Sequence, residues 1–124
     1  MSDKQEKLVK LFSSAQIRER VMGLACKISE EYIDRNPILV GVLNGSFIFL
    51  ADLVRSITID CEVDFIHATS YTGKKSSGIV TLNKGFSLDI RNRDIILIED
   101  IIDTGLTIDY ARKLALNMYP KSLE

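Results

Sequence analysis

The sequence has 124 residues, of which 46% are hydrophobic and 27% charged, and its formal net charge at pH 7 is −1. This length predicts one domain, residues 1–124, built around a single hydrophobic core. The near-neutral charge argues against a nucleic-acid partner. No apolar run approaches the roughly 20 residues that a bilayer requires, which argues against a membrane partner. The N-terminus has no signal-peptide pattern, so we expect a cytoplasmic protein with Cys26 and Cys61 as reduced thiols in its core.

The first part of the chain predicts a helix followed by a buried strand. Ser13 and Gln16 form a capping-box pattern, and apolar residues at helical spacing behind it predict a helix over residues 14–35. The segment Ile38–Leu43 is short, rich in β-branched residues and apolar throughout. It therefore predicts an interior strand of a parallel sheet.

A second helix and a second strand follow. A turn separates the first strand from a helical segment over residues 47–57, with Ser46 expected as its N-cap. We expect the apolar residues Phe47–Leu50 to pack this helix against the sheet. The alternating segment 61–71 predicts a strand.

The remainder continues the alternation of strand and helix. Residues 72–78 are polar and bounded by glycine, which predicts a loop, and residues 79–85 predict a strand. A turn region over 87–94 leads into 95–100, the most apolar strand, and 106–117 predicts a helix. This order predicts an α/β fold of Rossmann-like type, with a mainly parallel sheet flanked by helices.

Three carboxylates follow the most apolar strand. Glu99 and Asp100 come directly after it, and Asp103 lies three positions further on. Ligands of open parallel sheets bind outside the carboxyl ends of the strands. Two carboxylates about 6 Å apart repel by roughly 3 kcal/mol at an effective dielectric near 20, so they require a cation or hydrogen-bond donors beside them. Mg²⁺ held by Glu99 and Asp100, together with a hydroxyl-rich substrate, satisfies this need.

A turn at a helix N-terminus follows the carboxylates. In the segment Thr104–Thr107, backbone N–H groups, threonine hydroxyls and the helix dipole would converge on an anion. Each of these residues alone is common in solvated loops and ordinary turns. The whole run in this order predicts a site for a phosphorylated sugar.

The segment IILIEDIIDTGLT, residues 95–107, resembles the phosphoribosyl-pyrophosphate (PRPP) motif of type I phosphoribosyltransferases, in the form typical of the hypoxanthine-guanine branch. Residues 38–57 resemble the pyrophosphate-loop region of that branch, and residues 64–80 resemble its mobile loop. The similarity extends from about Ser14 to the C-terminus. It implies purine salvage, in which 5-phosphoribose passes from PRPP to hypoxanthine or guanine and gives IMP or GMP and pyrophosphate.

The resemblance also implies roles for individual residues. Glu99 and Asp100 would contact the ribose hydroxyls and the Mg²⁺ complex. Asp103 would bind PRPP and act as general base near N7 of the purine, with a pKa raised by its acidic neighbours. Ser70 and Tyr71, in the mobile loop, would close over the reacting centre and exclude water. The 5-phosphate would be wrapped by Thr104, Gly105, Leu106, Thr107 and Ile108. The pyrophosphate loop, where the family often has a non-proline cis peptide bond, would consist of Leu43, Asn44 and Gly45.

The sequence departs from the family pattern in two ways. Asn44 stands where the family usually has lysine, so one positive charge toward pyrophosphate is missing. Family members continue through further strands that carry the purine-binding residues, and this sequence contains no counterpart of them. Because residues 120–123 resemble the approach to another strand, we expect the C-terminal strands and the purine-binding part to be missing.

Other functions remain open on the sequence alone. The triplet Asp103–Gly105 also occurs in aspartic proteases, but here it leads into a helix, which such proteases do not have at that point. A PRPP-binding regulator or an inactive fragment is a closer alternative, although Asp103 favours catalysis because a sensor needs no base. No Gly-x-Gly-x-x-Gly or P-loop pattern is present. We expect a homo-oligomer, either a dimer or a tetramer, because members of the branch commonly pair subunits near Phe47–Leu50.

Overall fold

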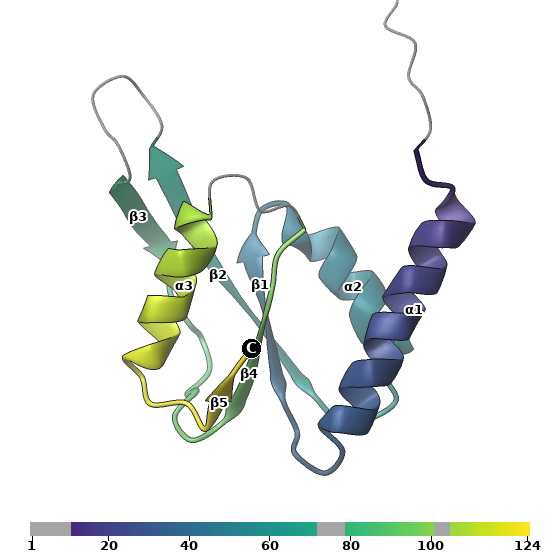
Figure 1. The fold of residues 1–124 in the computed structure, drawn as a ribbon. Helices are drawn as coiled ribbons and strands as arrows, with labels where there is room; N and C mark the ends of the chain where they lie inside the picture. Colours follow the sequence, from purple (N-terminus) through teal and green to yellow (C-terminus); the bar gives the residue numbers. More distant parts are fainter. Residues whose placement is uncertain (1–10, 72–78, 101–104) are drawn as a thin grey trace, which may run out of the picture.

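The computed structural model describes residues 11–71, 79–100 and 105–124. A five-stranded sheet lies between helices on its two faces (Figure 1). The elements in chain order are α1 (Ser14–Glu31), β1 (Ile38–Leu43), α2 (Ser46–Ser56), β2 (Glu62–Tyr71), β3 (Ile79–Lys84), β4 (Asp94–Ile98), α3 (Leu106–Leu116) and β5 (Ser122–Leu123).

The sheet has the strand order β3-β2-β1-β4-β5. Strand β1 lies in the middle and pairs in parallel with both β2 and β4, and β4 pairs in parallel with β5. Only β3 runs antiparallel, beside β2, with a register shift between His67 and Ala68. The predicted α/β fold with a mainly parallel sheet is therefore confirmed. Its central strand is apolar on both faces because both faces are covered.

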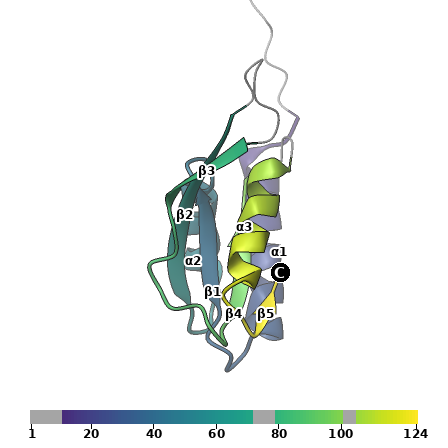
Figure 2. The same ribbon diagram turned by 90° about the vertical axis from the view of Figure 1, so that its left-hand side faces the viewer.

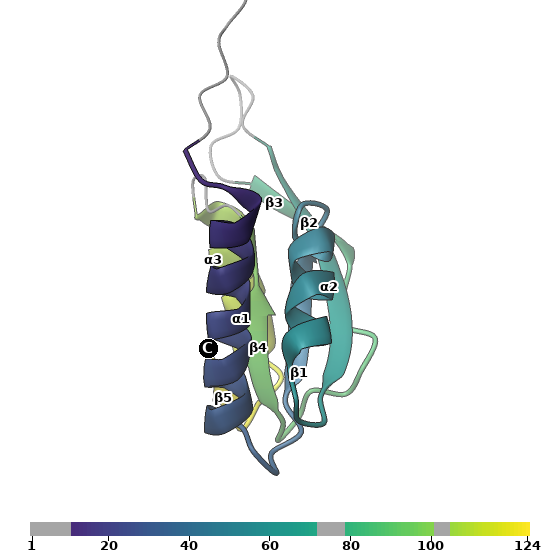
Figure 3. The ribbon, with the colours of Figure 1, turned by 90° about the vertical axis from the view of Figure 1, so that its right-hand side faces the viewer.

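Each face of the sheet has its own core. On one face Val40, Ile66 and Ile95 pack with the small residues Ala111 and Ala115 of α3, which stands in the foreground of Figure 2. On the other face a second cluster joins α1 and α2 to the sheet, and these two helices lie side by side in Figure 3. Its buried members are Ala25, Tyr32, Leu39, Leu50, Leu53, Ile96 and Ile98. Successive residues of β1 alternate between the two clusters, as the pleat of a strand requires.

The N-terminus of α1 is as predicted, but its C-terminus is not. Ser13 and Gln16 form a reciprocal capping box, with nitrogen–oxygen distances of 2.8 and 3.1 Å. The prediction that the helix reaches Arg35 is wrong, because it ends at Glu31 and turns follow. Asp34 (φ 60°) and Asn36 (φ 44°) adopt left-handed backbone conformations that cannot continue a right-handed helix.

Two predictions about α2 also need correction. Its N-cap is Gly45, so Ser46 is the first helical residue and not the cap. Of the four apolar residues expected to pack on the sheet, Leu50 is buried and Phe49 half-buried, whereas Phe47 is 54% and Ile48 61% exposed. Consecutive residues of a helix point about 100° apart, so four in a row cannot all face one surface.

The remaining elements agree with the predictions to within a residue or two at their ends, and β5 lies in the segment expected to approach a further strand. The loop predicted at 72–78 lies outside the described residues. Both cysteines are free thiols, as expected. The expectation of a core position is wrong for Cys26, which is exposed, whereas Cys61 is half-buried and packs against the core cluster on the α1 and α2 face. Within the described ranges, no helix combines the length and apolar character needed to cross a membrane.

Candidate active site

The order of the strands brings the carboxyl ends of β1 and β4 side by side, and the position between these two ends is called the crevice. These neighbouring strands are parallel, and β1 leads to α2 on one face of the sheet whereas β4 is followed by α3 on the other face. The carboxyl ends of two such strands form a topological switch point, which is where open α/β sheets bind their ligands. The loop 43–45 and the acidic pair Glu99–Asp100 both lie at this end of the sheet.

The loop at residues 43–45 is short and leads directly into α2. Leu43 ends β1 and is half-buried, and the exposed residues Asn44 and Gly45 complete the loop. The peptide bond between Leu43 and Asn44 is cis, as the family resemblance led us to expect. Leu43 is also in register with His67 of the neighbouring strand β2.

Gly45 lies directly against the carboxylate of Asp100. A Cβ atom added to Gly45 would lie 2.6 Å from Oδ2 and 2.8 Å from Oδ1 of Asp100, and the three nearest atoms all belong to this side chain. Gly45 has φ −64°, a conformation open to any residue, so the close approach and not the backbone requires glycine here. The predicted pyrophosphate loop and the predicted metal-binding carboxylate are thus in contact.

Glu99 is held in a less polar environment than Asp100. Its Oε2 atom is buried and has no hydrogen-bond partner among the described residues, whereas Asp100 is exposed. Burial, and to a smaller extent the charge of Asp100, raises the pKa of the Glu99 carboxyl. Glu99 also lines a cavity of about 280 Å³ between α1, α2 and β4.

The two carboxylates suit Mg²⁺. Carboxylate oxygens are the hard ligands that this ion prefers, and the buried oxygen of Glu99 lacks compensation among the described residues. The described residues contain no group of three or more acidic, histidine or cysteine side chains that could enclose a metal ion. Mg²⁺ binds proteins through one or two carboxylates and takes its other ligands from substrate phosphates and water, so this donor set fits it.

The start of α3 has the backbone geometry of an anion site. Gly105 is its N-cap, with φ 81° in the left-handed region that favours glycine, and this residue has no side chain with which to cap the helix. Leu106, Thr107 and Ile108 form the half-buried first turn, where N–H groups and the helix dipole attract anions. The acidic residue in this turn, Asp109, is paired with Lys113 at 3.1 Å.

Four predicted site residues lie wholly or partly outside the described residues. Asp103 and Thr104 lie outside the described residues. Ser70 and Tyr71 have a described backbone at the end of β2, in register with Val80 and Ile79 of β3, but their side chains lie outside the described part.

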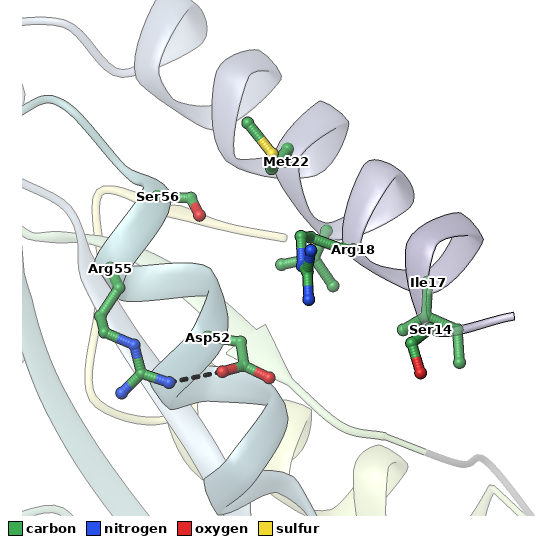
Figure 4. Close-up of a pocket in the computed structure, with 8 residues that line it drawn as sticks. Ser14, Ile17, Arg18, Met22, Asp52, Arg55 and Ser56 are labelled. Atoms are coloured by element: carbon green, nitrogen blue, oxygen red, sulfur yellow. Dashed lines mark hydrogen bonds and ion pairs between the residues drawn. The ribbon is translucent and has the colours of Figure 1, made fainter.

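A separate groove of about 430 Å³ lies between α1 and α2 (Figure 4). Exposed apolar side chains, Ile17 (55%) and Met22 (56%), contribute to its wall beside the ion pair of Arg55 with Asp52 at 2.5 Å. The groove lies along the C-terminal half of α2, whereas the crevice between β1 and β4 lies at its N-terminus. It was not foreseen from the sequence, and it does not form part of the candidate site.

Residues 10–124 match the phosphoribosyl transferase domain family. The chain belongs to the phosphoribosyltransferase family. It is 43% identical over 105 residues to a hypoxanthine-guanine phosphoribosyltransferase of Streptococcus mutans, in a match that covers 84% of this chain and 58% of that protein. The chain spans between 54% and 66% of the length of the curated relatives from Tritrichomonas foetus, Streptococcus mutans and Dictyostelium discoideum.

Solved phosphoribosyltransferase structures share the fold. A hypoxanthine-guanine phosphoribosyltransferase from Bacillus anthracis is 37% identical with a TM-score of 0.87, and the match covers 96% of this chain and 71% of that one. A hypoxanthine phosphoribosyltransferase variant from Trypanosoma cruzi, in complex with the product IMP, is 33% identical with a TM-score of 0.80, covering 92% of this chain and 63% of that one. These likenesses confirm the resemblance to the hypoxanthine-guanine branch and its fold.

Proposed function

We propose that this chain carries the PRPP-binding part of a 6-oxopurine phosphoribosyltransferase. The reaction transfers 5-phosphoribose from PRPP to hypoxanthine or guanine and releases pyrophosphate. The observation that carries the proposal is the contact of Asp100 with Gly45 at the crevice between β1 and β4. This contact joins a carboxylate suited to a metal-bound ribose to a loop suited to pyrophosphate.

Each described part of the site has a proposed role. Glu99 and Asp100 accept hydrogen bonds from the ribose hydroxyls and ligate Mg²⁺, which would neutralise charge on the pyrophosphate group. The backbone at Asn44 and Gly45 binds the pyrophosphate, next to the Asp100 carboxylate. Residues 105–108 bind the 5-phosphate, supported by the helix N-terminus that begins at Gly105.

The residues outside the described part complete the proposed mechanism. Asp103 accepts the proton from the purine, and Thr104 binds the 5-phosphate with residues 105–108. Ser70 and Tyr71 cover the reacting centre and exclude water. The location of Ser70 and Tyr71 at the end of β2, which neighbours β1, supports this role.

The choice of purine rests on the relatives. The Streptococcus mutans relative is named for hypoxanthine and guanine, and the Trypanosoma cruzi structure contains IMP. We extend these substrates to the present chain as a proposal. We also propose a cytoplasmic location, supported by two free thiols, which are usual in a reducing compartment.

Calorimetric titration with PRPP, with and without Mg²⁺, tests the binding half of the proposal. We expect Mg²⁺-dependent binding that is lost in Asp100→Asn. The matched control is Asp52→Asn, which removes a charge from the exposed ion pair on α2 and leaves binding unchanged. Absence of binding to the folded wild-type chain, or equal binding by Asp100→Asn, would contradict the proposal.

Formation of IMP from PRPP and hypoxanthine tests the transfer step. We expect Asp103→Asn to lower the rate of transfer at least about 100-fold while PRPP still binds, because a positioned base contributes 10²–10⁴-fold. PRPP binding by the wild-type chain without any transfer would favour the alternative, which is a PRPP-binding regulator or an inactive fragment without transferase activity.

We further propose a homo-oligomer that uses the exposed apolar pair Phe47 and Ile48 at the start of α2. Sedimentation of Ile48→Asp should then give a smaller species than the wild type. The control is Ile33→Asp, since Ile33 and Ile48 are both 61% exposed but Ile33 lies in the turn after α1. A monomeric wild type would refute this part of the proposal.

A further inference from the structure

A buried hydroxyl lies directly beneath the loop that we propose for pyrophosphate. Ser46, the first residue of α2, is completely buried. Its Oγ donates a hydrogen bond of 2.7 Å to the carbonyl oxygen of Val42. Val42 is the penultimate residue of β1 and belongs to the core cluster on the α3 face. The bond therefore joins the start of α2 to the end of β1 across the loop.

The loop is thereby held from two sides. Below it, the bond between Ser46 and Val42 fixes the separation of the two chain segments from which the loop emerges. On its other side, Gly45 has no room for even one more carbon atom before it meets the Asp100 carboxylate. A shift of the loop by a few tenths of an ångström would alter this approach, because even a Cβ atom on Gly45 would lie only 2.6 Å from the Asp100 carboxylate.

The hydroxyl of Ser46 does not act as the N-terminal cap of α2. A serine at a helix N-terminus normally accepts a bond from a backbone N–H of the first turn, but here Gly45 is the N-cap and no side-chain cap bond is present at this end. Ser46 instead donates back to the strand. A bond in this direction ties the first residue of α2 to the end of β1 and does not cap the helix.

We propose that Ser46 is a positioning residue for substrate binding: its buried hydroxyl sets the place of Asn44 and Gly45 relative to the Asp100 carboxylate. The inference rests on the proposed function, since it assigns to Ser46 a role in the binding of Mg²⁺-PRPP. Ser46 is completely buried, so it acts through the loop and does not need to touch the substrate.

The chain contains a matched control for this role. Ser29 of α1 is also buried, and its Oγ also donates to the carbonyl oxygen four residues earlier, that of Ala25, at 2.8 Å. It also accepts a bond of 3.1 Å from the backbone N–H of Thr58. Ser29→Ala therefore removes a comparable buried hydrogen bond, and a second one, away from the crevice. A role that concerns stability alone would make the two variants behave alike.

The first experiment measures the dissociation constant of Mg²⁺-PRPP by calorimetry for the wild type, Ser46→Ala and Ser29→Ala. We expect about a tenfold rise for Ser46→Ala and no change for Ser29→Ala. We expect both variants to lose a few degrees in melting temperature, about 3–6 °C, and Ser29→Ala to lose at least as much as Ser46→Ala, because Ser46→Ala loses one hydrogen bond and Ser29→Ala loses two. Ser46→Cys, a nearly isosteric but weak donor, should fall between the wild type and Ser46→Ala.

The second measurement uses backbone amide NMR spectra of the free proteins. The signals of Asn44, Gly45 and Asp100 should shift in Ser46→Ala and remain in place in Ser29→Ala. This measurement requires no ligand, so it tests the position of the loop even if the proposed function is wrong.

The possible outcomes separate the two proposals. If wild type and Ser46→Ala bind Mg²⁺-PRPP equally, or if Ser29→Ala weakens binding as much, the inference is overturned while the proposed function stands. If the wild type does not bind Mg²⁺-PRPP, the proposed function fails and with it the role of Ser46 in binding. Unmoved signals of Asn44 and Gly45 in Ser46→Ala would also overturn the inference.

Discussion

The carboxylates at the two ends of the sheet differ in their hydrogen-bond partners and in the direction in which their pKa values are shifted. Near the amino end of β4, Asp94 is buried but receives hydrogen bonds from Arg35 at 2.8 and 3.1 Å and from Ser122. The guanidinium of Arg35 holds the pKa of Asp94 below its usual range. At the carboxyl end, Glu99 has a buried oxygen without a partner among the described residues, and its pKa is raised by burial.

A second buried acid, Asp64, also has its hydrogen-bond partners within the protein. Asp64 of β2 is 4% exposed and accepts bonds of 2.8–2.9 Å from the backbone N–H groups of Phe65, Ser87 and Leu88. It also lies 3.6 Å from the ammonium group of Lys84. Asp94 and Asp64, which hold the fold together, have their partners within the protein, whereas the buried oxygen of Glu99 has none among the described residues. A buried acid without a described partner is a candidate for ligand binding, and a paired one contributes to stability.

The largest effect on stability is expected when the hydrogen bonds to the Asp94 carboxylate are weakened. Asp94→Asn should lower the free energy of unfolding by about 2 kcal/mol at pH 7, since hydrogen bonds to a charged group are lost. The folded-state pKa of Asp94 is lowered, so its stabilisation is present above the unfolded value of 3.8 and is lost as the pH falls through the folded value. Urea denaturation at pH 7, 5 and 3 should therefore show the difference from wild type at pH 7 and 5 and a smaller one at pH 3.

Asp52→Asn is the control for this prediction. Its carboxylate is also paired with an arginine, Arg55, but on the surface, so its loss should change stability by at most about 0.5 kcal/mol. An effect of Asp94→Asn that does not diminish at low pH would show that the ion pair is not its cause.

The next effect is on PRPP binding and concerns the contact between Gly45 and Asp100. Gly45→Ala should weaken Mg²⁺-PRPP binding about tenfold, or about 1.4 kcal/mol, because the new methyl group displaces the Asp100 carboxylate. Gly23→Ala is the matched control, since nothing lies within 4 Å of a Cβ at that helical position. It should leave binding unchanged and raise the free energy of unfolding by about 0.5–1 kcal/mol. Calorimetry and urea denaturation measure the two quantities, and unchanged binding by Gly45→Ala would mean that the contact is irrelevant to the site.

The smallest effect should have the opposite sign. Glu99→Gln removes a half-buried charge without a described partner, and it should increase the free energy of unfolding at pH 7.5 by about 1 kcal/mol. The same variant should bind Mg²⁺-PRPP more weakly, because it loses a metal ligand. Thermal unfolding and calorimetry on the same sample test both statements. A destabilised variant would show that the Glu99 carboxylate is already compensated in the folded protein.

The local patterns in the sequence predicted most of the fold. The periods of apolar residues predicted the strands and helices, and the pair Ser13 and Gln16 predicted the start of α1, because these signals depend only on neighbouring residues. The end of α1 was missed because Asp34 and Asn36 turn the chain, and both residue types tolerate left-handed conformations. The exposure of Phe47 and Ile48 was missed because an unbroken apolar run does not reveal which residues face the core.

The candidate site was predictable only in part. The place of Glu99 and Asp100 after a buried strand follows from the sequence, since it needs only the end of one element. The contact of Asp100 with Gly45 does not follow, because it depends on β1 lying beside β4. Strand β1 also pairs with the next strand in sequence, β2, and no local pattern identifies the neighbour on its other side.

The attachment of β5 has a consequence for how the molecule opens. This strand contributes only two residues, yet Glu124 is hydrogen-bonded to Tyr32 at the end of α1 and exchanges backbone bonds of 2.8 and 2.9 Å with Leu97 and Ile95. Arg35 lies 4.5 Å from the centre of the Tyr32 ring and pairs with Asp94. These contacts link the end of α1 to β5, so we expect the two elements to unfold locally in one step. Hydrogen exchange should accordingly find the amides of Leu97 and Glu124 opening in the same cooperative step as the last turn of α1.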